Sequence, residues 1–165
     1  MENERNKDAV PAETELRSID WEEYTRLCRL IARRAKESFS PELVVGIAHG
    51  GVIVGATVAS ILHRDMFPIK FSRRVNARVL RKRFKVLVPP TAELKGKRVL
   101  LVDDSSNTGE TLKEAMAQIK KFKPAAVFTA VLVRRGEFQP DSYAVYSKNH
   151  VVFPWQNENS TNRGR

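Results

Sequence analysis

The chain is poor in the residues that make covalent or metal crosslinks, with one cysteine, Cys28, and three histidines among 165 residues. A single thiol cannot form an internal disulfide, and one cysteine with scattered histidines lacks the spacing of a zinc site. These absences exclude a disulfide-stapled secreted domain and favour a reduced, cytoplasmic setting. The opening residues, MENERNKDAVPAETE, are charged throughout, so we expect no secretory signal.

Residues 44–62 contain no Asp, Glu, Lys or Arg, and a run of that length has the dimensions of a membrane span. His49 and four glycines interrupt it, and the pair Gly50-Gly51 is typical of a turn between a strand and a helix. We therefore predict a strand, a turn and a helix here, and no membrane segment. The chain also has no internal repeat and no low-complexity segment.

Acidic residues are missing from 70–85, which holds eight Lys and Arg. The net charge of the whole chain is +10, yet outside this stretch 21 basic residues face 19 acidic ones. The basicity is therefore local, and such a stretch attracts phosphates, either on a small molecule or on nucleic acid. A solvated surface loop that aids solubility is the alternative.

Hydrophobic periodicity predicts one three-layer α/β domain with a mostly parallel sheet, over residues 18–156. A mobile tail over 1–17 precedes it and a polar tail over 157–165 follows it. The predicted helices begin at Asp20, with Glu23 as a capping-box partner, and cover about 52–62 and 108–122, where Pro124 stops the last one. Apolar runs predict strands over 43–47, 68–72, 84–88, 98–102, 126–133 and, at an edge, 143–147.

The most informative stretch is VLLVDDSSNTGET, residues 99–111. Asp103 and Asp104 stand where the predicted strand ends, and two adjacent carboxylates there need a cation or hydroxyl partner. A helix that begins at or near Thr108 would offer backbone N–H groups to an anion. The loop would thus hold a phosphate and a diol, as in a ribose 5-phosphate, although a plain strand-to-helix turn with Ser and Thr caps is the alternative.

A second loop, IAHGG, follows the first buried strand, and ligands in parallel sheets bind beside such loops. Gly50 and Gly51 let backbone amides face an anion, and His49 adds a donor. No GK[ST] follows, so the loop is not a Walker loop, and it does not fit a dinucleotide fingerprint. Taken alone, a Gly-Gly pair also fits an ordinary turn.

LLVDDSSNTGET resembles the phosphoribosyl pyrophosphate motif of the type I phosphoribosyltransferases: hydrophobic residues, two acids and a T-G-x-T turn. The likeness covers about residues 20–156. VVGIAHGG matches the diphosphate loop of that family, 70–85 its flexible loop, and FPWQ (153–156) the tail of its hood. The pattern is closest to bacterial and archaeal enzymes for hypoxanthine, guanine and xanthine.

The resemblance implies a transferase of purine salvage that uses phosphoribosyl pyrophosphate and Mg²⁺ to convert a nucleobase to its nucleoside 5′-monophosphate. Asp103 and Asp104 would meet the ribose hydroxyls, directly or through Mg²⁺, and Arg134 and Val151 would lie against the base. Residues 107–111 would cradle the 5-phosphate, and the substrate-binding residues of this loop would be Ser105, Ser106, Thr108, Gly109, Glu110 and Thr111. The pyrophosphate would meet Ala48, His49, Gly50 and Gly51, and the flexible-loop residues Arg73, Arg74, Arg78 and Arg81. A homodimer is usual in this family.

Three residues depart from the family pattern. Asn107 replaces the acid that handles the N7 proton in 6-oxopurine enzymes, and an amide is not a base at neutral pH. His49 replaces an Arg or Lys, and His150 stands where some relatives stack an aromatic ring on the purine. The same fold also serves as a non-catalytic regulator, which senses phosphoribosyl pyrophosphate or a nucleotide and binds nucleic acid. That is the alternative to an enzyme, and a domain with an inactive pocket is a third.

Overall fold

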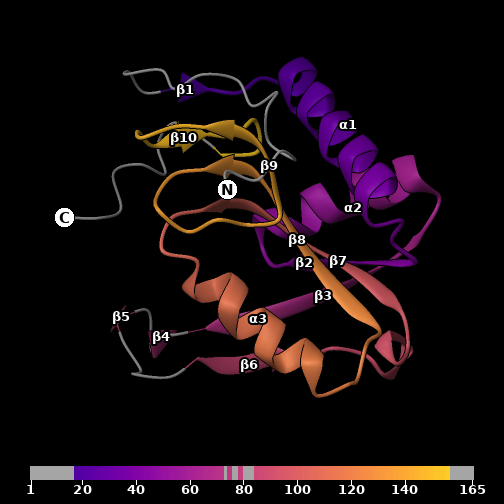
Figure 1. The fold of residues 1–165 in the computed structure, drawn as a ribbon. Helices are drawn as coiled ribbons and strands as arrows, with labels where there is room; N and C mark the ends of the chain where they lie inside the picture. The colour runs from indigo at the N-terminus through magenta and orange to yellow at the C-terminus, as the bar shows by residue number, and fades with distance from the viewer. Residues whose placement is uncertain (1–16, 73, 76–77, 80–83, 157–165) are drawn as a thin grey trace.

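A computed structural model describes residues 17–72, 74–75, 78–79 and 84–156, and shows a central sheet between helices (Figure 1). Six strands lie in the order β6-β3-β2-β7-β8-β9. Neighbouring strands are parallel except β3 and β6, which are antiparallel. Their bounds are β2 Leu43–Ile47, β3 Asp65–Ser72, β6 Lys85–Val88, β7 Arg98–Ser106, β8 Ala126–Arg134 and β9 Ser142–Tyr146. The predicted mostly parallel sheet, with β9 at an edge, is confirmed.

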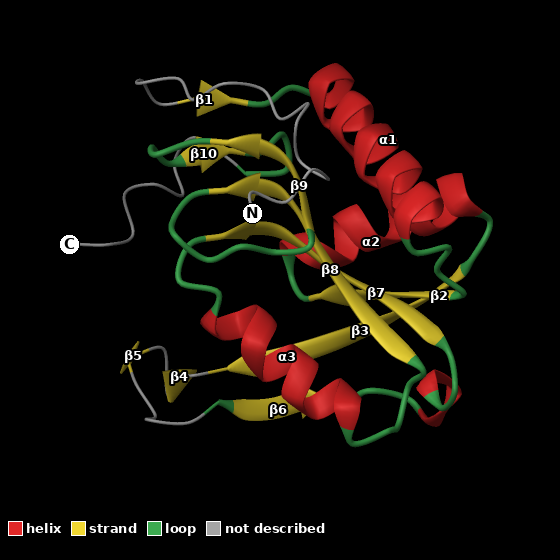
Figure 2. Ribbon diagram, in the orientation of Figure 1, coloured by secondary structure: helices red, strands yellow, loops and turns green. Residues whose placement is uncertain are grey.

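Helices cover both faces of this sheet. α1 (Trp21–Ser38) and α2 (Gly50–Leu62) lie on one face and α3 (Glu110–Lys120) on the other, with a short 3₁₀ turn, η2 (Ala92–Leu94) (Figure 2). All five residues of β2 are buried. Val44 packs in the cluster under α1 and α2, whereas Val45 packs in the cluster under α3. Burial on both faces explains why this strand is a continuous apolar run rather than an alternating one.

The first helix follows its sequence signals closely. The Oδ1 atom of Asp20 accepts a hydrogen bond from the backbone N–H of Glu23 at 2.7 Å, as a helix N-cap does. The capping box is half formed, because the Glu23 carboxylate is bonded by Arg17 and Arg26. The predicted apolar face is buried, and comprises Tyr24, Leu27, Cys28, Ile31 and Ala35.

Boundaries near the two ligand loops differ from prediction. β7 continues to Ser106 instead of ending at residue 102, because its pairing with β8 continues to Arg134. α3 begins at Glu110 and ends at Lys120, so the predicted helix over 108–122 was two residues too long at each end. α2 begins at Gly50, so the glycine pair is the first turn of the helix and not a turn before it. Both acids therefore stand within a strand, and both glycines within a helix.

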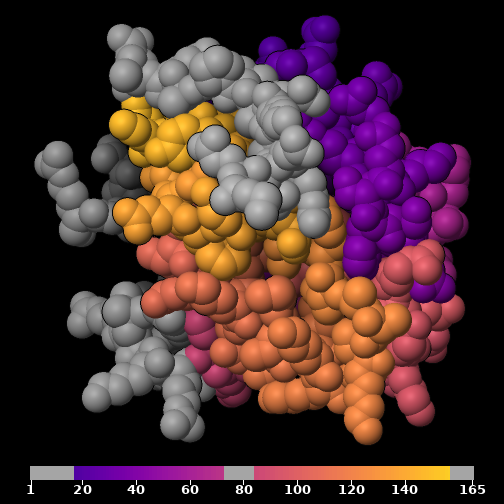
Figure 3. All heavy atoms as spheres, viewed as in Figure 1, coloured from indigo at the N-terminus to yellow at the C-terminus, as the bar shows by residue number. Residues whose placement is uncertain are grey.

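A second, smaller sheet joins the two ends of the described chain. β1 (Arg17–Ser18) pairs in parallel with β10 (Val151–Val152), so residue 17 belongs to a strand and not to the predicted tail. We name β1, β10 and residues 153–156 the hood. Phe153 and Trp155 stack with their ring centroids 4.7 Å apart, and Trp155 meets Tyr24 of α1 edge-on. In Figure 3 the yellow hood residues lie above the orange residues around α3 on the face shown.

The basic stretch holds a small hairpin, in which β4 (Arg74–Val75) pairs antiparallel with β5 (Arg78–Val79). Arg73 and Arg81, predicted as flexible-loop residues, lie outside the described residues, as do most of both predicted tails. In Figure 2 the hairpin, the amino end of α3 and β10 lie on the same side of the molecule. Among the described residues, no helix combines the length and the apolarity that a membrane crossing requires.

Candidate active site at the carboxyl ends of the parallel strands

The turn between β7 and α3, residues 105–111, forms the wall of a polar pocket, and we name it the phosphate turn. Its pocket has a volume of about 210 Å³. It is lined by Asp103, Ser105, Ser106, Asn107, Thr108, Gly109, Glu110, Thr111 and Leu112. The Ser106 side chain is buried, and its Oγ has no hydrogen-bond partner among the described residues. A buried hydroxyl without a partner is costly, so this oxygen is a ready donor for an anion at the amino end of α3.

Gly109 has the backbone conformation that this turn requires. Its φ is +73°, which favours glycine, and it caps α3. A Cβ at this position would stand 2.2 Å from the ring of Phe138. The loop after β8 therefore lies directly against the phosphate turn, and only a residue without a side chain fits between them.

Asp103 and Asp104, the acid pair, are half-buried at the end of β7. Asp103 Oδ1 accepts the N–H of Asp104 at 2.9 Å, and Asp104 Oδ1 accepts the N–H of Ser105 at 2.6 Å. Burial, with the adjacent charge of Asp104, holds the pKa of Asp103 well above its usual range. Burial also raises the pKa of Asp104, although bonds from Ser105 oppose this. No described Lys or Arg forms an ion pair with either acid, so the pair is suited to an external cation or diol.

The loop Ala48–Gly51, which we name the diphosphate loop, lies against the acid pair. A Cβ on Gly50 would stand 1.8 Å from Asp104 Oδ2, and one on Gly51 would stand 2.9 Å from Asp103 Oδ1. These glycines thus allow two loops, about fifty residues apart in sequence, to touch. The peptide bond between Ala48 and His49 is cis, and the Ala48 N–H bonds Ile69 O at 2.8 Å.

A lysine that sequence reasoning did not single out joins this loop. Lys70 Nζ lies 3.0 Å from Nε2 of His49, the residue that replaces the expected Arg or Lys. Register places it there, because Ile69 of β3 pairs with Ile47 of β2 just before the loop. The positive charge of the expected Arg or Lys is therefore available from Lys70 on the neighbouring strand. The basic composition of 70–85 was the available signal, but it did not distinguish Lys70 from its seven neighbours.

The residues present fit a magnesium ion shared with a ligand. Among the described residues, no cluster of three or more His, Cys, Asp or Glu side chains could enclose a metal alone. Mg²⁺ usually keeps several waters and binds through one or two carboxylates together with substrate phosphates. Asp103 and Asp104 would provide the carboxylates, and a cation would offset the burial and mutual repulsion that raise the pKa of Asp103.

On the other side of β7 lie the predicted base contacts, Arg134 and Val151, which both meet other parts of the protein. Arg134 Nε donates to Gly136 O at 3.0 Å and to Phe138 O at 3.2 Å. Its guanidinium also lies over the rings of Tyr143 and Tyr146. The structure thus places Arg134 as an anchor of the loop after β8, and Val151 as a buried residue of the hood.

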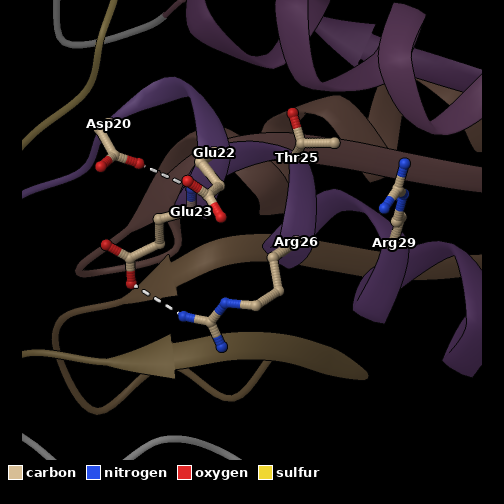
Figure 4. A pocket seen from close by; sticks show the side chains of 6 residues that line it. All are labelled: Asp20, Glu22, Glu23, Thr25, Arg26 and Arg29. Carbon is tan, nitrogen blue, oxygen red and sulfur yellow. Dashed lines mark hydrogen bonds and ion pairs between the residues drawn. The ribbon is translucent and has the colours of Figure 1, made fainter.

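A larger hollow than the pocket at the phosphate turn lies elsewhere, on the outer face of α1 (Figure 4). It is lined by Asp20, Glu22, Glu23, Thr25, Arg26 and Arg29. Asp20 caps the helix and Glu23 bonds Arg26 at 3.3 Å, so these charges largely meet each other (Figure 4). None of the predicted site residues lines this hollow, and the smaller pocket at the phosphate turn is the candidate site.

Comparison with known proteins assigns the chain to a family. A family model described as a phosphoribosyl transferase domain matches residues 20–159. The chain belongs to this family. The resemblance predicted from residues 99–111 is therefore confirmed, together with the type of fold that it implied.

Three relatives illustrate the range of this phosphoribosyltransferase family. The chain is 32% identical over 127 residues to the transcriptional regulator GfcR of Archaeoglobus fulgidus. This alignment covers 71% of this chain and 64% of the regulator. It is 28% identical over 156 residues to a xanthine-guanine phosphoribosyltransferase of Gluconobacter oxydans, at 88% coverage of both. The crystal structure of a purine phosphoribosyltransferase from Pyrococcus horikoshii superposes with a TM-score of 0.79 at 26% identity, covering 87% of this chain and 95% of that one. The chain thus spans less than two thirds of the regulator's length.

Proposed function

We propose that this phosphoribosyltransferase binds phosphoribosyl pyrophosphate with Mg²⁺ and transfers its phosphoribosyl group to a purine base. The observation that carries this proposal is the contact of the diphosphate loop with the acid pair, where Gly50 leaves no room for a Cβ beside Asp104. This contact brings an anion loop, two carboxylates and the phosphate turn to one edge of the sheet. Phosphoribosyl pyrophosphate carries a matching sequence of groups: a pyrophosphate, a diol and a phosphate monoester.

In the proposed reaction, a base nitrogen forms a bond to the anomeric carbon as the bond to pyrophosphate oxygen breaks, and the base releases its ring N–H proton to water. The pyrophosphate leaves with the electron pair of that bond. The diphosphate loop, Lys70 and His49 would hold the leaving group, and the acid pair would orient the ribose hydroxyls. Mg²⁺, when bound, neutralises charge on the pyrophosphate. Positioning and charge stabilisation would provide most of the rate enhancement, because the base is the nucleophile and the reaction requires none from the protein.

The choice of a purine is supported by the relatives, because both the structural neighbour from P. horikoshii and the G. oxydans enzyme are named for purines. Asn107 argues for slow turnover of hypoxanthine and guanine, since its amide cannot take a proton from the base. A homodimer and a cytoplasmic location remain predictions.

A second candidate is a regulator that binds the same ligand without turnover and meets nucleic acid through residues 70–85. The similarity to GfcR favours it, as does the amide at residue 107. For such a regulator, the phosphate turn and acid pair would bind a sensed metabolite, and the eight basic residues would bind nucleic-acid phosphates.

One panel of assays separates the two candidates. Nucleobases incubated with phosphoribosyl pyrophosphate and Mg²⁺ should release pyrophosphate if the protein is an enzyme. Filter-binding titrations with RNA and DNA at physiological salt test the regulator, because non-specific binding typically gives a Kd of about 10⁻⁴ to 10⁻⁶ M. Sequence-selective binding below that range, without pyrophosphate release from any base, would favour the regulator.

A further inference from the structure

The strand order determines where the base would lie if the proposed function holds. β7, which carries the acid pair and the phosphate turn, stands between β2 and β8. The diphosphate loop follows β2, so the pyrophosphate on the anomeric carbon would lie on that side. A base approaches the opposite face of the anomeric carbon, which points it toward the loop after β8 and the hood. We name Asn107, Arg135 and His150 the base side.

Arg135 reaches across this space, whereas Arg134 does not. The backbone N–H of Arg135 bonds Ser106 O at 2.7 Å, beside Asn107. Its Nη1 lies 3.4 Å from Nδ1 of His150, which immediately precedes β10. The side chain therefore extends from the phosphate turn to the hood. Arg134 is held away by the carbonyls of Gly136 and Phe138.

Arg135 also has hydrogen-bonding capacity to spare. Its Nε is buried and has no partner among the described residues. A buried donor without an acceptor carries a desolvation cost, and a ligand acceptor would recover that free energy. The Nη1 contact with His150 is long and therefore weak. A ligand oxygen between these groups would meet a guanidinium that is already in place.

We propose that Arg135 and Asn107 together select a purine ring whose outer edge presents two acceptors. The guanidinium has five N–H donors and no acceptor, and the Asn107 amide offers N–H donors where a carboxylate would offer none. Guanine presents N7 and O6, both acceptors, along one edge, whereas adenine presents the acceptor N7 and a donor amino group. The base side thus favours a 6-oxopurine nucleotide over an adenine nucleotide.

Asn107 also favours binding of the nucleotide product over binding of the free base. In a nucleotide joined at N9, N7 has a lone pair, which an amide N–H can meet and a carboxylate would repel. This inference rests on the proposed phosphate and ribose contacts, and it assigns the selection of the base to Arg135 rather than to Arg134.

Calorimetric titration of the full chain with three probes tests the proposal. The probes are guanosine 5′-monophosphate, adenosine 5′-monophosphate and ribose 5-phosphate, which has no base. We expect the guanosine nucleotide to bind at least tenfold more tightly than the adenosine nucleotide. Arg135→Met should reduce that ratio to about twofold or less and leave ribose 5-phosphate binding unchanged. Arg135→Lys keeps the positive charge but loses the planar, bidentate donor geometry of the guanidinium. It should show an intermediate ratio of guanosine to adenosine nucleotide affinity.

Arg33→Met, at an exposed position of α1, is the matched control and should change none of these affinities. Equal binding of the two nucleotides by the wild type would overturn the proposal, as would an Arg135→Met variant that keeps the full ratio. If ribose 5-phosphate itself fails to bind, the proposed function fails with it. If ribose 5-phosphate binds normally and only the base preference is missing, the assignment of Arg135 alone is wrong.

Discussion

The phosphate side of the site, which comprises the acid pair and the phosphate turn, comes from one contiguous stretch, residues 103–111, and the strand-to-helix turn orients its groups. The base side is assembled from three segments that lie far apart in sequence, around residues 107, 135 and 150. The first arrangement is dictated by local geometry, because a strand that ends in a glycine turn and a helix presents its amides in one direction. The second depends on the pairing of β8 with β9 and of β10 with β1, and on where one arginine is held.

The two sides also differ in how tightly they are packed. Near the acid pair, a Cβ on Gly50 or Gly51 would overlap with aspartate atoms, so this half of the site tolerates almost no change of shape. The base side contains an exposed histidine, a long weak contact and an arginine Nε with no partner among the described residues. A family that keeps one co-substrate and changes the other would be expected to divide its site in this way.

Removal of both carboxylates tests the phosphate side most severely. Asp103→Asn with Asp104→Asn should weaken Mg²⁺-dependent binding of phosphoribosyl pyrophosphate by about 100-fold or more, since two hydrogen bonds to charged groups are each worth about 1.5–3 kcal/mol. Calorimetry with and without Mg²⁺ measures this loss. Asp65→Asn, at an exposed position of β3, is the control, and unchanged binding in the double variant would refute the assignment.

A single methyl group should also disrupt this side. Gly50→Ala places a Cβ 1.8 Å from the present position of Asp104 Oδ2, so the carboxylate must move. Overpacking of this kind costs about 1–3 kcal/mol, which is about 5- to 150-fold in affinity if it falls on the ligand. Gly96→Ala is the control, because that glycine has positive φ but nothing within 4 Å of its Cβ position. The control should lose stability and keep its affinity for phosphoribosyl pyrophosphate.

On the base side, Asn107→Asp replaces a hydrogen-bond donor with a carboxylate that can accept a proton. Turnover of hypoxanthine and guanine should rise about tenfold or more, since a positioned general base contributes about 10²- to 10⁴-fold. Binding of guanosine 5′-monophosphate should weaken, because a carboxylate repels the lone pair on N7. Steady-state rates and calorimetry on the same preparations measure both. Fast turnover by the wild type would show that the amide is no handicap.

A smaller effect is expected at the diphosphate loop. Lys70→Met removes the cation beside His49 and should weaken pyrophosphate binding by about fivefold, as expected for about 1 kcal/mol from a partly exposed charge. Lys70→Arg should restore most of it. Lys120→Met, at the exposed carboxyl end of α3, serves as the control in the same inhibition assay.

The last expected effect concerns the stability of the protein without ligand. Both acids have raised pKa values in the folded chain, so the folded state holds their protons to higher pH than the unfolded chain does. The free energy of unfolding should therefore fall as pH rises from the ordinary carboxyl pKa through these raised values. The loss is about 1.4 kcal/mol for every tenfold difference in proton affinity between the two states. Melting temperatures measured in a chelator from pH 4 to 8 should fall less steeply for Asp103→Asn than for the wild type.

The sequence alone predicted the order of strand, turn and helix around the acid pair because its signals are local. The apolar run over 98–102, the two acids and the T-G-x-T turn stand in order, so the strand, the turn and the helix follow from neighbouring residues. The exact ends did not follow, since β7 continues to Ser106 only because β8 pairs with it that far. The closeness of Gly50 to Asp104 was equally out of reach, because it arises from the pairing of β2 with β7.

The base side shows the limit of motif reading. Arg134 and Arg135 are neighbours, and composition cannot say which side chain bonds the loop carbonyls and which one faces His150. That choice depends on the register of β8 against β9, where Arg134 pairs with Tyr146 and lies over its ring. Lys70 illustrates the same point, since it became distinct from the other basic residues only through the register of β3.

The parallel pairing of β1 with β10 has a consequence for the order in which parts of the molecule fold and locally unfold. Arg17 and Val151, which pair in this sheet, are separated by nearly the whole described chain. This sheet pairs at two positions on each strand, whereas β7 and β8 of the central sheet pair at eight. The hood should therefore form last and open first, while the sheet beneath it stays folded. Amide hydrogen exchange should be fast at Val152 and slow at Leu100, so that the base side opens to solvent many times for each time that the phosphate side does.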